Sequence, residues 1–282
     1  MKKILLAIAA GILVSSGGLC QDARDLFPDR PGSLTVWTEV ISEPRPLRIS
    51  YLKVALTAPE LEIVTLTGED PDGPGPAESK LTQPTELFRK FGALAAVNAN
   101  AYAVVSGDTA PPGWFEGRSV DVLGMAASDG KIISHAEKDR TTFWTDAVGK
   151  PHIGSPASLD SVDEAVSDWF SPLLIDSLVV PDPADKVLHP RTAVCFDDSG
   201  TWLLLVVVDG RKPGFSEGVS LYELAKILQS RNCRQSLNLD GGGSSIMLVR
   251  EGEEIRTINS PSDKRHRPVP IMLGVRSKGK KE

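Results

Sequence analysis

The sequence is poor in the residues that hold metals or carry a chain through a membrane. Its 282 residues include only three cysteines and four histidines, and neither set has the spacing of a zinc site. After residue 20, no apolar run is long enough to span a bilayer as a helix. We therefore expect no metal centre built on these residues, no cofactor and no stable membrane insertion.

The chain also lacks an excess of basic charge. It carries 31 lysines and arginines against 37 aspartates and glutamates, a formal net charge of −6 at pH 7. Proteins that bind nucleic acids set distributed basic charge against the phosphate backbone. The composition therefore argues against a nucleic-acid partner, and any phosphate must be recognised locally.

The first twenty residues differ from the rest. A basic start, an apolar run at residues 4–14 and small residues up to Cys20 are typical of a secretory signal peptide. A lipid anchor at Cys20 is the alternative, but residues 17–19 fit that signal poorly, so cleavage after Cys20 is preferred. We expect an exported protein, periplasmic or extracellular, with residues 21–33 as a polar lead-in.

Two cysteines, Cys195 and Cys233, remain beyond the signal. Export permits a disulfide between them, which would stabilise the fold by roughly 3–4 kcal/mol in the chain-entropy model. However, Cys195 lies in an apolar, strand-like run and could be a small core residue instead. The sequence leaves both interpretations open.

Strand patterns dominate the chain after the lead-in. Alternating apolar and polar residues predict three strands of a meander at 34–41, 47–56 and 61–67. The apolar run 202–208 predicts a strand buried on both faces at the centre of a sheet. A short amphipathic helix is expected at 161–170.

A capping box at Ser220 to Glu223 begins a second helix, between two strands. Such a crossover favours some parallel pairing. We predict one α+β domain over residues 34–276, with a central mixed, largely antiparallel β-sheet flanked by a few helices. Residues 277–282 are expected to be a disordered tail.

The segment Asp240-Gly241-Gly242-Gly243-Ser244 lies between two apolar runs of strand length. Three glycines allow positive φ, so successive N–H groups can point into one concavity. Together with the Asp240 carboxylate, these amides would suit a phosphate or a developing oxyanion. The alternative is a glycine-rich hairpin turn, although two glycines would be enough for that.

A second charged pair follows the most apolar run. Asp209 and Arg211 come directly after residue 208. A charged residue at the end of a buried strand is either a satisfied structural group or part of a site. A carboxylate and a guanidinium two residues apart favour the site.

Five short motifs follow one another along the chain. They are His189-Pro190-Arg191-Thr192-Ala193, Asp209-Gly210-Arg211, the segment from Gly214 to Leu221, the segment from Leu237 to Ser245, and Arg267-Pro268-Val269. In this order they resemble the phosphodiester glycosidase family, over roughly residues 90–276.

The resemblance implies an exported hydrolase that cleaves a sugar-1-phosphodiester on a glycan or envelope polymer, so that a phosphorylated glycan or sugar-phosphate polymer is its partner. Asp240 is then the first candidate for the carboxylate that stabilises, attacks or activates water at the oxocarbenium-like centre, and Asp209 is the second. Arg191, Arg211 and the amides of Gly241 to Ser244 would bind the phosphate. Further hydrogen-bonding positions are Asn98, Thr192 and Ser216.

Two other functions stay open. The same residues could hold a phosphorylated glycan without hydrolysis, as a binding protein in envelope polysaccharide assembly. Alternatively, Asp209 and Asp240 could be ligands for a hard cation in a metal-dependent phosphodiesterase. Turnover separates the first alternative from an enzyme, and activity in chelator tests the second.

Overall fold

The computed structural model describes residues 19–20, 23–26, 32–263 and 265–279. Most of the predicted signal peptide, part of the lead-in and residues 280–282 of the predicted tail lie outside these described residues. Among the helices that are described, none combines the length and apolar character needed to cross a membrane.

Nine strands form the largest sheet. They are β1 (Leu19–Cys20), β2 (Arg24–Asp25), β3 (Leu34–Ile41), β4 (Leu47–Ala55), β15 (Pro172–Ile175), β16 (Leu178–Val179), β17 (Arg191–Phe196), β18 (Trp202–Val208) and β19 (Gln235–Asn238). The order is β1-β3-β4-β18-β17-β19-β15-β16, and β2 pairs with β3. The predicted central strand is confirmed, because β18 lies between β4 and β17 and residues 203–208 are buried.

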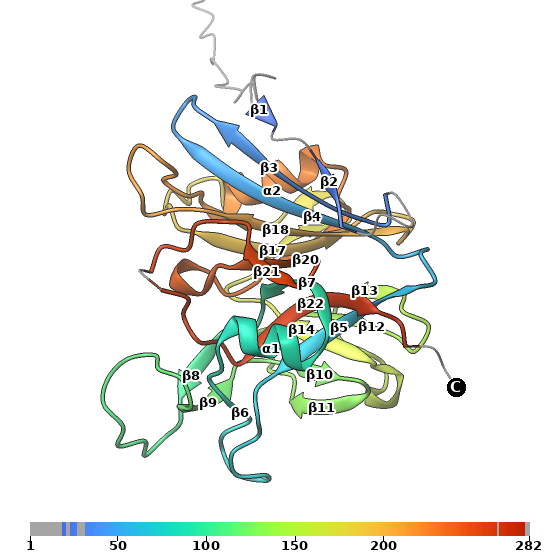
Figure 1. Ribbon diagram of the computed structural model, residues 1–282, viewed down its shortest axis with the longest axis vertical. Helices are drawn as coiled ribbons and strands as arrows, with labels where there is room; N and C mark the ends of the chain where they lie inside the picture. The colour runs from blue at the N-terminus through green and yellow to red at the C-terminus, as the bar shows by residue number, and fades with distance from the viewer. Residues whose placement is uncertain (1–18, 21–22, 27–31, 264, 280–282) are drawn as a thin grey trace, which may run out of the picture.

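Three smaller sheets complete the β structure. One has the order β21-β20-β7-β22-β5, the next β11-β10-β14-β12-β13, and the last β6-β9-β8. Their strands are β5 (Leu61–Thr67), β6 (Ser79–Lys80), β7 (Ala93–Asn98), β8 (Tyr102–Val104), β9 (Ser119–Val122), β10 (Ala126–Ser128), β11 (Lys131–Ser134), β12 (Thr142–Thr145), β13 (Pro151–Ile153), β14 (Glu164–Ser167), β20 (Met247–Glu251), β21 (Glu254–Thr257) and β22 (Ile271–Ser277). Figure 1 shows the β20–β7–β22 sheet in the middle of the molecule, between the large sheet and the β10–β14 sheet.

The main core fills the space between the sheets. Apolar side chains of β17, β18 and β19, among them Val194, Leu205 and Leu237, form one cluster with Val97 of β7 and Leu273 of β22. Burial of a side chain of this kind stabilises the fold by about 1.5–3 kcal/mol. This core fixes the ends of β7, β17 and β19 beside one another, where the motifs of the sequence lie.

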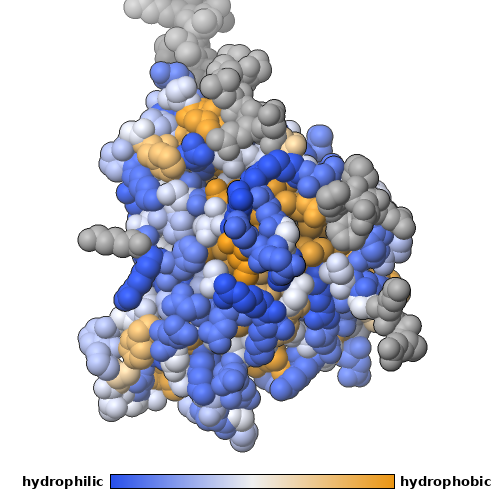
Figure 2. Space-filling model, in the orientation of Figure 1, coloured by the Kyte–Doolittle hydropathy of each residue, from blue (hydrophilic) through white to orange (hydrophobic). Residues whose placement is uncertain are grey.

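In the described part of the chain, two α-helices cover the outer faces. In α1 (Pro84–Lys90), Leu87 and Phe88 are buried against the β20–β7–β22 sheet. In α2 (Leu221–Ser230), Leu224 and Leu228 pack on the large sheet, and the capping box that begins at Ser220 is confirmed. Hydrophilic side chains cover most of the face in Figure 2, with smaller apolar areas between them.

The α+β class is confirmed, but the expected mixture of parallel and antiparallel pairs is wrong. Every strand pair in the described part of the chain is antiparallel. The crossover through α2 does connect two strands of like direction, β18 and β19. They do not pair, because β17 lies between them and is antiparallel to both.

Two further expectations were wrong. The predicted meander is divided, because β3 pairs with β4 whereas β5 joins β22 in another sheet. The helix expected at 161–170 is instead a short 3-10 turn, η1 (Leu159–Ser161), followed by strand β14. A short apolar segment fits the period of a helix as well as that of a strand, so pairing with neighbouring strands decides which structure it adopts.

Cys195 of β17 and Cys233, just after α2, form a disulfide, with their Cα atoms 5.8 Å apart. Both residues are buried in the cluster beneath α2. The bridge therefore fastens the end of the crossover helix to the sheet, close to the strand that leads to Asp240.

Candidate active site

Asp240 follows the end of β19 and points its carboxyl into a polar cluster. Its backbone N–H donates to the carbonyl oxygen of Ala99 at 2.8 Å, which ties it to the end of β7. Its Oδ1 accepts the N–H of Gly241 at 2.9 Å. The next residues form a 3-10 turn, η2 (Gly242–Ser244).

The surroundings of Asp240 shift its acidity in both directions. Desolvation raises the pKa of this partly exposed carboxyl to about 6. Hydrogen bonding from Ser244 and Gly241, and the positive charges of Arg267 and Arg211, act in the opposite direction. The carboxyl is therefore mostly ionised at neutral pH and lies close to positive charge.

The glycines of η2 make room for the two guanidinium groups. Gly242 has φ +62°, and a Cβ there would lie 3.1 Å from an Nη atom of Arg211. A Cβ on Gly243 would collide with the guanidinium of Arg267. Only glycines let both cations approach the turn so closely.

The amides of this turn are used differently from the expectation. The N–H of Gly241 donates to Asp240, that of Gly242 to Pro190 O at 3.0 Å, and that of Ser244 to Gly241 O at 3.2 Å. Three of the four amides expected to bind an anion are therefore satisfied within the protein. As a correction, the Asp240 carboxyl itself accepts the Gly241 N–H, and the positive charges near it are the guanidinium groups of Arg267 and Arg211.

Arg211 is held in an unusual conformation. Its φ is +60°, in the left-handed region that non-glycine residues rarely occupy, and its side chain is exposed. Its guanidinium lies 3.2 Å from Nδ1 of His189. Burial, followed by the charges of Arg191 and Arg211, lowers the pKa of His189, so this ring is neutral and accepts the hydrogen bond.

Arg267 approaches Asp240 from the C-terminal loop. It forms an ion pair with Asp263 at 3.0 Å. Tyr102 lies at the same place, with its hydroxyl donating to the Pro268 carbonyl oxygen at 3.3 Å. Burial, and then the charge of Asp240, raise the pKa of Tyr102, so its hydroxyl stays protonated and can donate.

An aromatic wall adjoins Tyr102. The ring of Trp114 meets that of Tyr102 edge to face, with centroids 4.8 Å apart. The Arg118 guanidinium lies 5.6 Å from the Trp114 ring and 5.4 Å from that of Phe115. Trp114 and Phe115 remain 37% and 38% exposed, so part of this aromatic surface is accessible beside the Arg118 guanidinium.

Asp209, the second predicted carboxylate, has other neighbours. It is 2% exposed and accepts the Ser260 N–H at 2.8 and 3.0 Å and the Asn259 amide at 3.1 Å. Burial raises the pKa of Asp209, and these hydrogen bonds oppose that shift. It thus anchors the start of the loop that carries Arg267 and offers little free acceptor capacity to a substrate.

Asn98 and Thr192 lie beneath Asp240 rather than beside a ligand. Asn98 accepts the Thr192 hydroxyl at 2.8 Å and the Ile246 N–H at 3.1 Å. Its amide donates to the Asp240 carbonyl oxygen at 2.6 Å. The side chains of Asn98 and Thr192 are both buried, so they support Asp240 from the interior of the protein.

Ser216 and Arg191 are also engaged within the protein. The Ser216 hydroxyl donates to Asp209 O at 2.7 Å. Arg191 is 5% exposed and donates to the carbonyl oxygens of Val219 at 3.2 Å and Val187 at 3.3 Å. Of the predicted phosphate-binding side chains, Arg211 is the one that is both exposed and close to Asp240.

Three residues at this site were not expected from the sequence. Arg267 belongs to the Arg-Pro-Val motif, and His189 begins the His-Pro-Arg motif. Both residues therefore lie in motifs on which the resemblance rests. Tyr102 ends the run that begins at Asn98. Their roles depend on contacts between distant segments, which no local pattern reveals.

No three His, Cys, Asp or Glu side chains of the described residues come together in a way that could hold a metal ion. Asp209 and Asp240 are instead surrounded by N–H donors and cations.

A family model described as "Phosphodiester glycosidase" matches residues 72–276. The chain belongs to the phosphodiester glycosidase family. The family supports hydrolase activity in general, and the matched range contains the whole cluster around Asp240. A curated relative, the SPbeta prophage-derived uncharacterized protein YomE of Bacillus subtilis, is 40% identical over 74 residues, which are 26% of this chain and 11% of that protein.

Solved structures share the fold of this family member. The catalytic domain of zebrafish N-acetylglucosamine-1-phosphodiester alpha-N-acetylglucosaminidase, auto-inhibited by its pro-peptide, matches with a TM-score of 0.66 and 20% identity, over 93% of this chain and 88% of that one. A hypothetical protein from Synechocystis matches with a TM-score of 0.61 and 14% identity, over 87% and 62%. A putative exported protein from Burkholderia pseudomallei matches with a TM-score of 0.54 and 14% identity, over 84% and 75%. At these identities the likeness establishes the fold.

Proposed function

We propose that the protein hydrolyses the bond between the anomeric carbon of a sugar and a phosphodiester oxygen, on a glycan or an envelope polymer. The observation that carries the proposal is the Asp240 carboxyl with the guanidinium groups of Arg211 and Arg267 beside it. Family membership supports the same reaction class.

The cations suit the leaving group. When the bond between the anomeric carbon and oxygen breaks, its electron pair stays on the phosphate, which leaves as a monoester. A phosphate monoester has a second pKa near ~6, so it needs little help from a general acid. It needs neutralisation of the developing charge, which Arg211 and Arg267 supply by charge-assisted hydrogen bonds.

The carboxylate suits the sugar. The anomeric carbon becomes positively charged as the phosphate departs, and an ionised Asp240 stabilises that charge, attacks the carbon or takes a proton from water. Water supplies the hydroxyl of the released sugar, and its other proton goes to the medium or the phosphate. The pKa of about 6 means that Asp240 is mostly ionised at pH 7.

The aromatic wall suits the rest of the substrate. The exposed rings of Trp114 and Phe115 adjoin Tyr102, on the side of Asp240 where that tyrosine lies. Sugar rings pack their C–H faces on such aromatic surfaces, which bury apolar area at low conformational cost. We assign the sugar to this wall and the phosphate to the two arginines.

Export is part of the proposal, because residues 1–20 have the pattern of a secretory signal. A substrate on a secreted or envelope glycan would then be accessible to the protein.

The test is to incubate the purified protein with a panel of sugar-1-phosphodiesters and measure free sugar, with and without chelator. We expect release that survives chelator and is absent with Asp240→Asn. Release that stops in chelator would favour the metal-dependent phosphodiesterase. If the panel gives no release but the phosphodiesters bind, the protein is a phosphoglycan-binding module and the proposal is wrong.

A further inference from the structure

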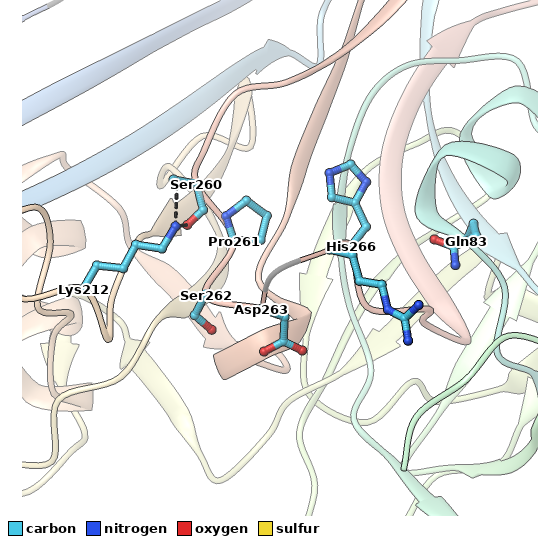
Figure 3. Close-up of a pocket in the computed structure, with 8 residues that line it drawn as sticks. Gln83, Lys212, Ser260, Pro261, Ser262, Asp263 and His266 are labelled. Carbon is cyan, nitrogen blue, oxygen red and sulfur yellow. Dashed lines mark hydrogen bonds between the residues drawn. The ribbon is translucent and has the colours of Figure 1, made fainter.

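A cavity lies beside residues 260–263, 265 and 266, just before Arg267 of the Asp240 cluster. Its volume is about 680 Å³. The residues that line it are Gln83, Lys212, Ser260, Pro261, Ser262, Asp263, Arg265 and His266. Figure 3 shows Lys212 reaching Ser260 on one side and His266 with Gln83 on the other.

The lining is polar and carries positive charge. Lys212 and Arg265 are its cations, and Asp263, the one carboxylate among the lining residues, is paired with Arg267. Arg265 is exposed and forms no ion pair within the part of the chain that the structure describes. In a chain of net charge −6, this is a local concentration of basic charge.

The cavity also offers hydrogen-bond donors. Lys212 is held in place by the Ser260 hydroxyl at 2.6 Å and the Ser260 carbonyl oxygen at 3.3 Å. An ammonium group has three donors, so one remains for a ligand. The hydroxyl of Ser262 has no hydrogen-bond partner among the described residues.

One peptide bond and one ion pair connect the lining of the cavity to the Asp240 cluster. Lys212 directly follows Arg211, which lies against Gly242, and adjacent Cα atoms are about 3.8 Å apart. Asp263 lines the cavity and pairs with Arg267, which lies against Gly243. An anion in the cavity would therefore lie directly beyond the phosphate bound at Asp240.

We propose that this cavity binds a second phosphate of the same substrate, so that the preferred substrate is a chain of sugar-phosphate repeats rather than a single capped phosphate. The inference rests on the proposed function for the position of the first phosphate. Arg265 and Lys212 contact the phosphate of the neighbouring repeat, and the bond at Asp240 is the one that is cleaved.

The test compares two synthetic substrates, with one and with two sugar-1-phosphate repeats. We expect the wild type to favour the two-repeat compound in kcat/KM by about tenfold, the value of one charge-assisted contact of roughly 1.4 kcal/mol. Arg265→Ala should lose this preference through KM and leave the one-repeat reaction unchanged. Arg265→Lys should restore part of it.

Two controls sharpen the test. Lys226→Ala removes an exposed cation from α2, which packs on the large sheet and does not line the cavity, and should leave the preference intact. Since exposed charges are screened by salt, 0.5 M salt should reduce the preference of the wild type but not of Arg265→Ala. The same ratio in wild type and Arg265→Ala would overturn the proposal.

A failure of the proposed function would give a different result. If the wild type hydrolyses neither compound, calorimetry measures their dissociation constants for the wild type and Arg265→Ala. Tighter binding of the two-repeat compound that is lost in Arg265→Ala supports the second phosphate site without hydrolysis. Equal affinities for the two compounds contradict it.

Discussion

Asp209 and Asp240 give the same signal in the sequence and have different surroundings in the fold. Each follows a strand that neighbours β17, and each precedes a glycine. Asp240 is partly exposed and lies between guanidinium groups, whereas Asp209 is 2% exposed and accepts hydrogen bonds from Asn259 and Ser260. Burial raises both pKa values.

The difference lies in what surrounds each charge. Donors that belong to the protein's own turn stay on Asp209 whether or not a ligand is present. The cations near Asp240 are side chains from two other segments, Arg211 beside His189 and Arg267 beside Asp263. We propose that the segment folded against a strand-end aspartate decides whether it is catalytic or structural, and the predictions below separate the two roles.

Asp240→Asn should have the largest effect. The amide keeps the shape and the hydrogen bond from Gly241 but cannot attack, accept a proton or stabilise a cation as a carboxylate does. We expect turnover of a sugar-1-phosphodiester to fall by at least roughly 10³-fold. The circular dichroism spectrum should not change, and a variant that keeps most of the activity would remove Asp240 from the mechanism.

Arg267→Ala should have the next largest effect. It removes one of the two cations that neutralise the departing phosphate, which we expect to lower kcat by about 10²-fold. Arg256→Ala, which removes an exposed arginine of β21, is the matched control and should be nearly neutral. If both variants lose activity equally, general surface charge and not the cluster is responsible.

Asp209→Asn should sharpen the contrast by acting mainly on stability. The amide oxygen can still accept the hydrogen bonds made to Oδ1, but the NH2 that replaces Oδ2 would face the Ser260 N–H, donor against donor, at a cost of about 1–3 kcal/mol. For a domain of this size that lowers Tm by about 2–4 °C per kcal/mol. Thermal unfolding measures this directly, and a loss of turnover as severe as that of Asp240→Asn, without destabilisation, would make Asp209 catalytic as well.

Much of this fold could be predicted from local patterns. Residues 202–208 and the capped helix α2 agree closely with the expectation, because long apolar runs and caps act within one segment. Residues 161–170 do not agree with the expected helix. Their four apolar side chains fit a helix face as well as a strand that is buried between β10 and β12. The pairing of β17 between β18 and β19 also depends on contacts that no local period encodes.

The site could be predicted only in part, for the same reason. Asp240 and Arg211 were identified because they lie in short motifs at strand ends. The assignment of phosphate binding to Asn98 and Thr192 required knowing that both face inward, where they bond to each other. Arg267 was missed as a site residue because its position at Asp240 depends on a loop that is anchored by Asp209.

The smallest expected effect is a difference between the two aspartates in how the stability of their variants depends on pH. The pKa of Asp240 is raised from about 4 in the unfolded chain to about 6 in the fold. The folded state therefore binds the proton more tightly, and the stability that this gives is fully present below pH 4 and is lost as the pH rises through 6.

Asp240→Asn removes this loss, because an amide does not ionise. We expect the variant to exceed the wild type in stability at pH 8 by on the order of 1 kcal/mol, after allowing for the partial exposure of the carboxyl, and to match it at pH 4. Asp209→Asn should be destabilised at pH 8, since it loses an acceptor of backbone hydrogen bonds there. Thermal unfolding of both variants at the two pH values measures the contrast, and equal shifts for the two variants would contradict it.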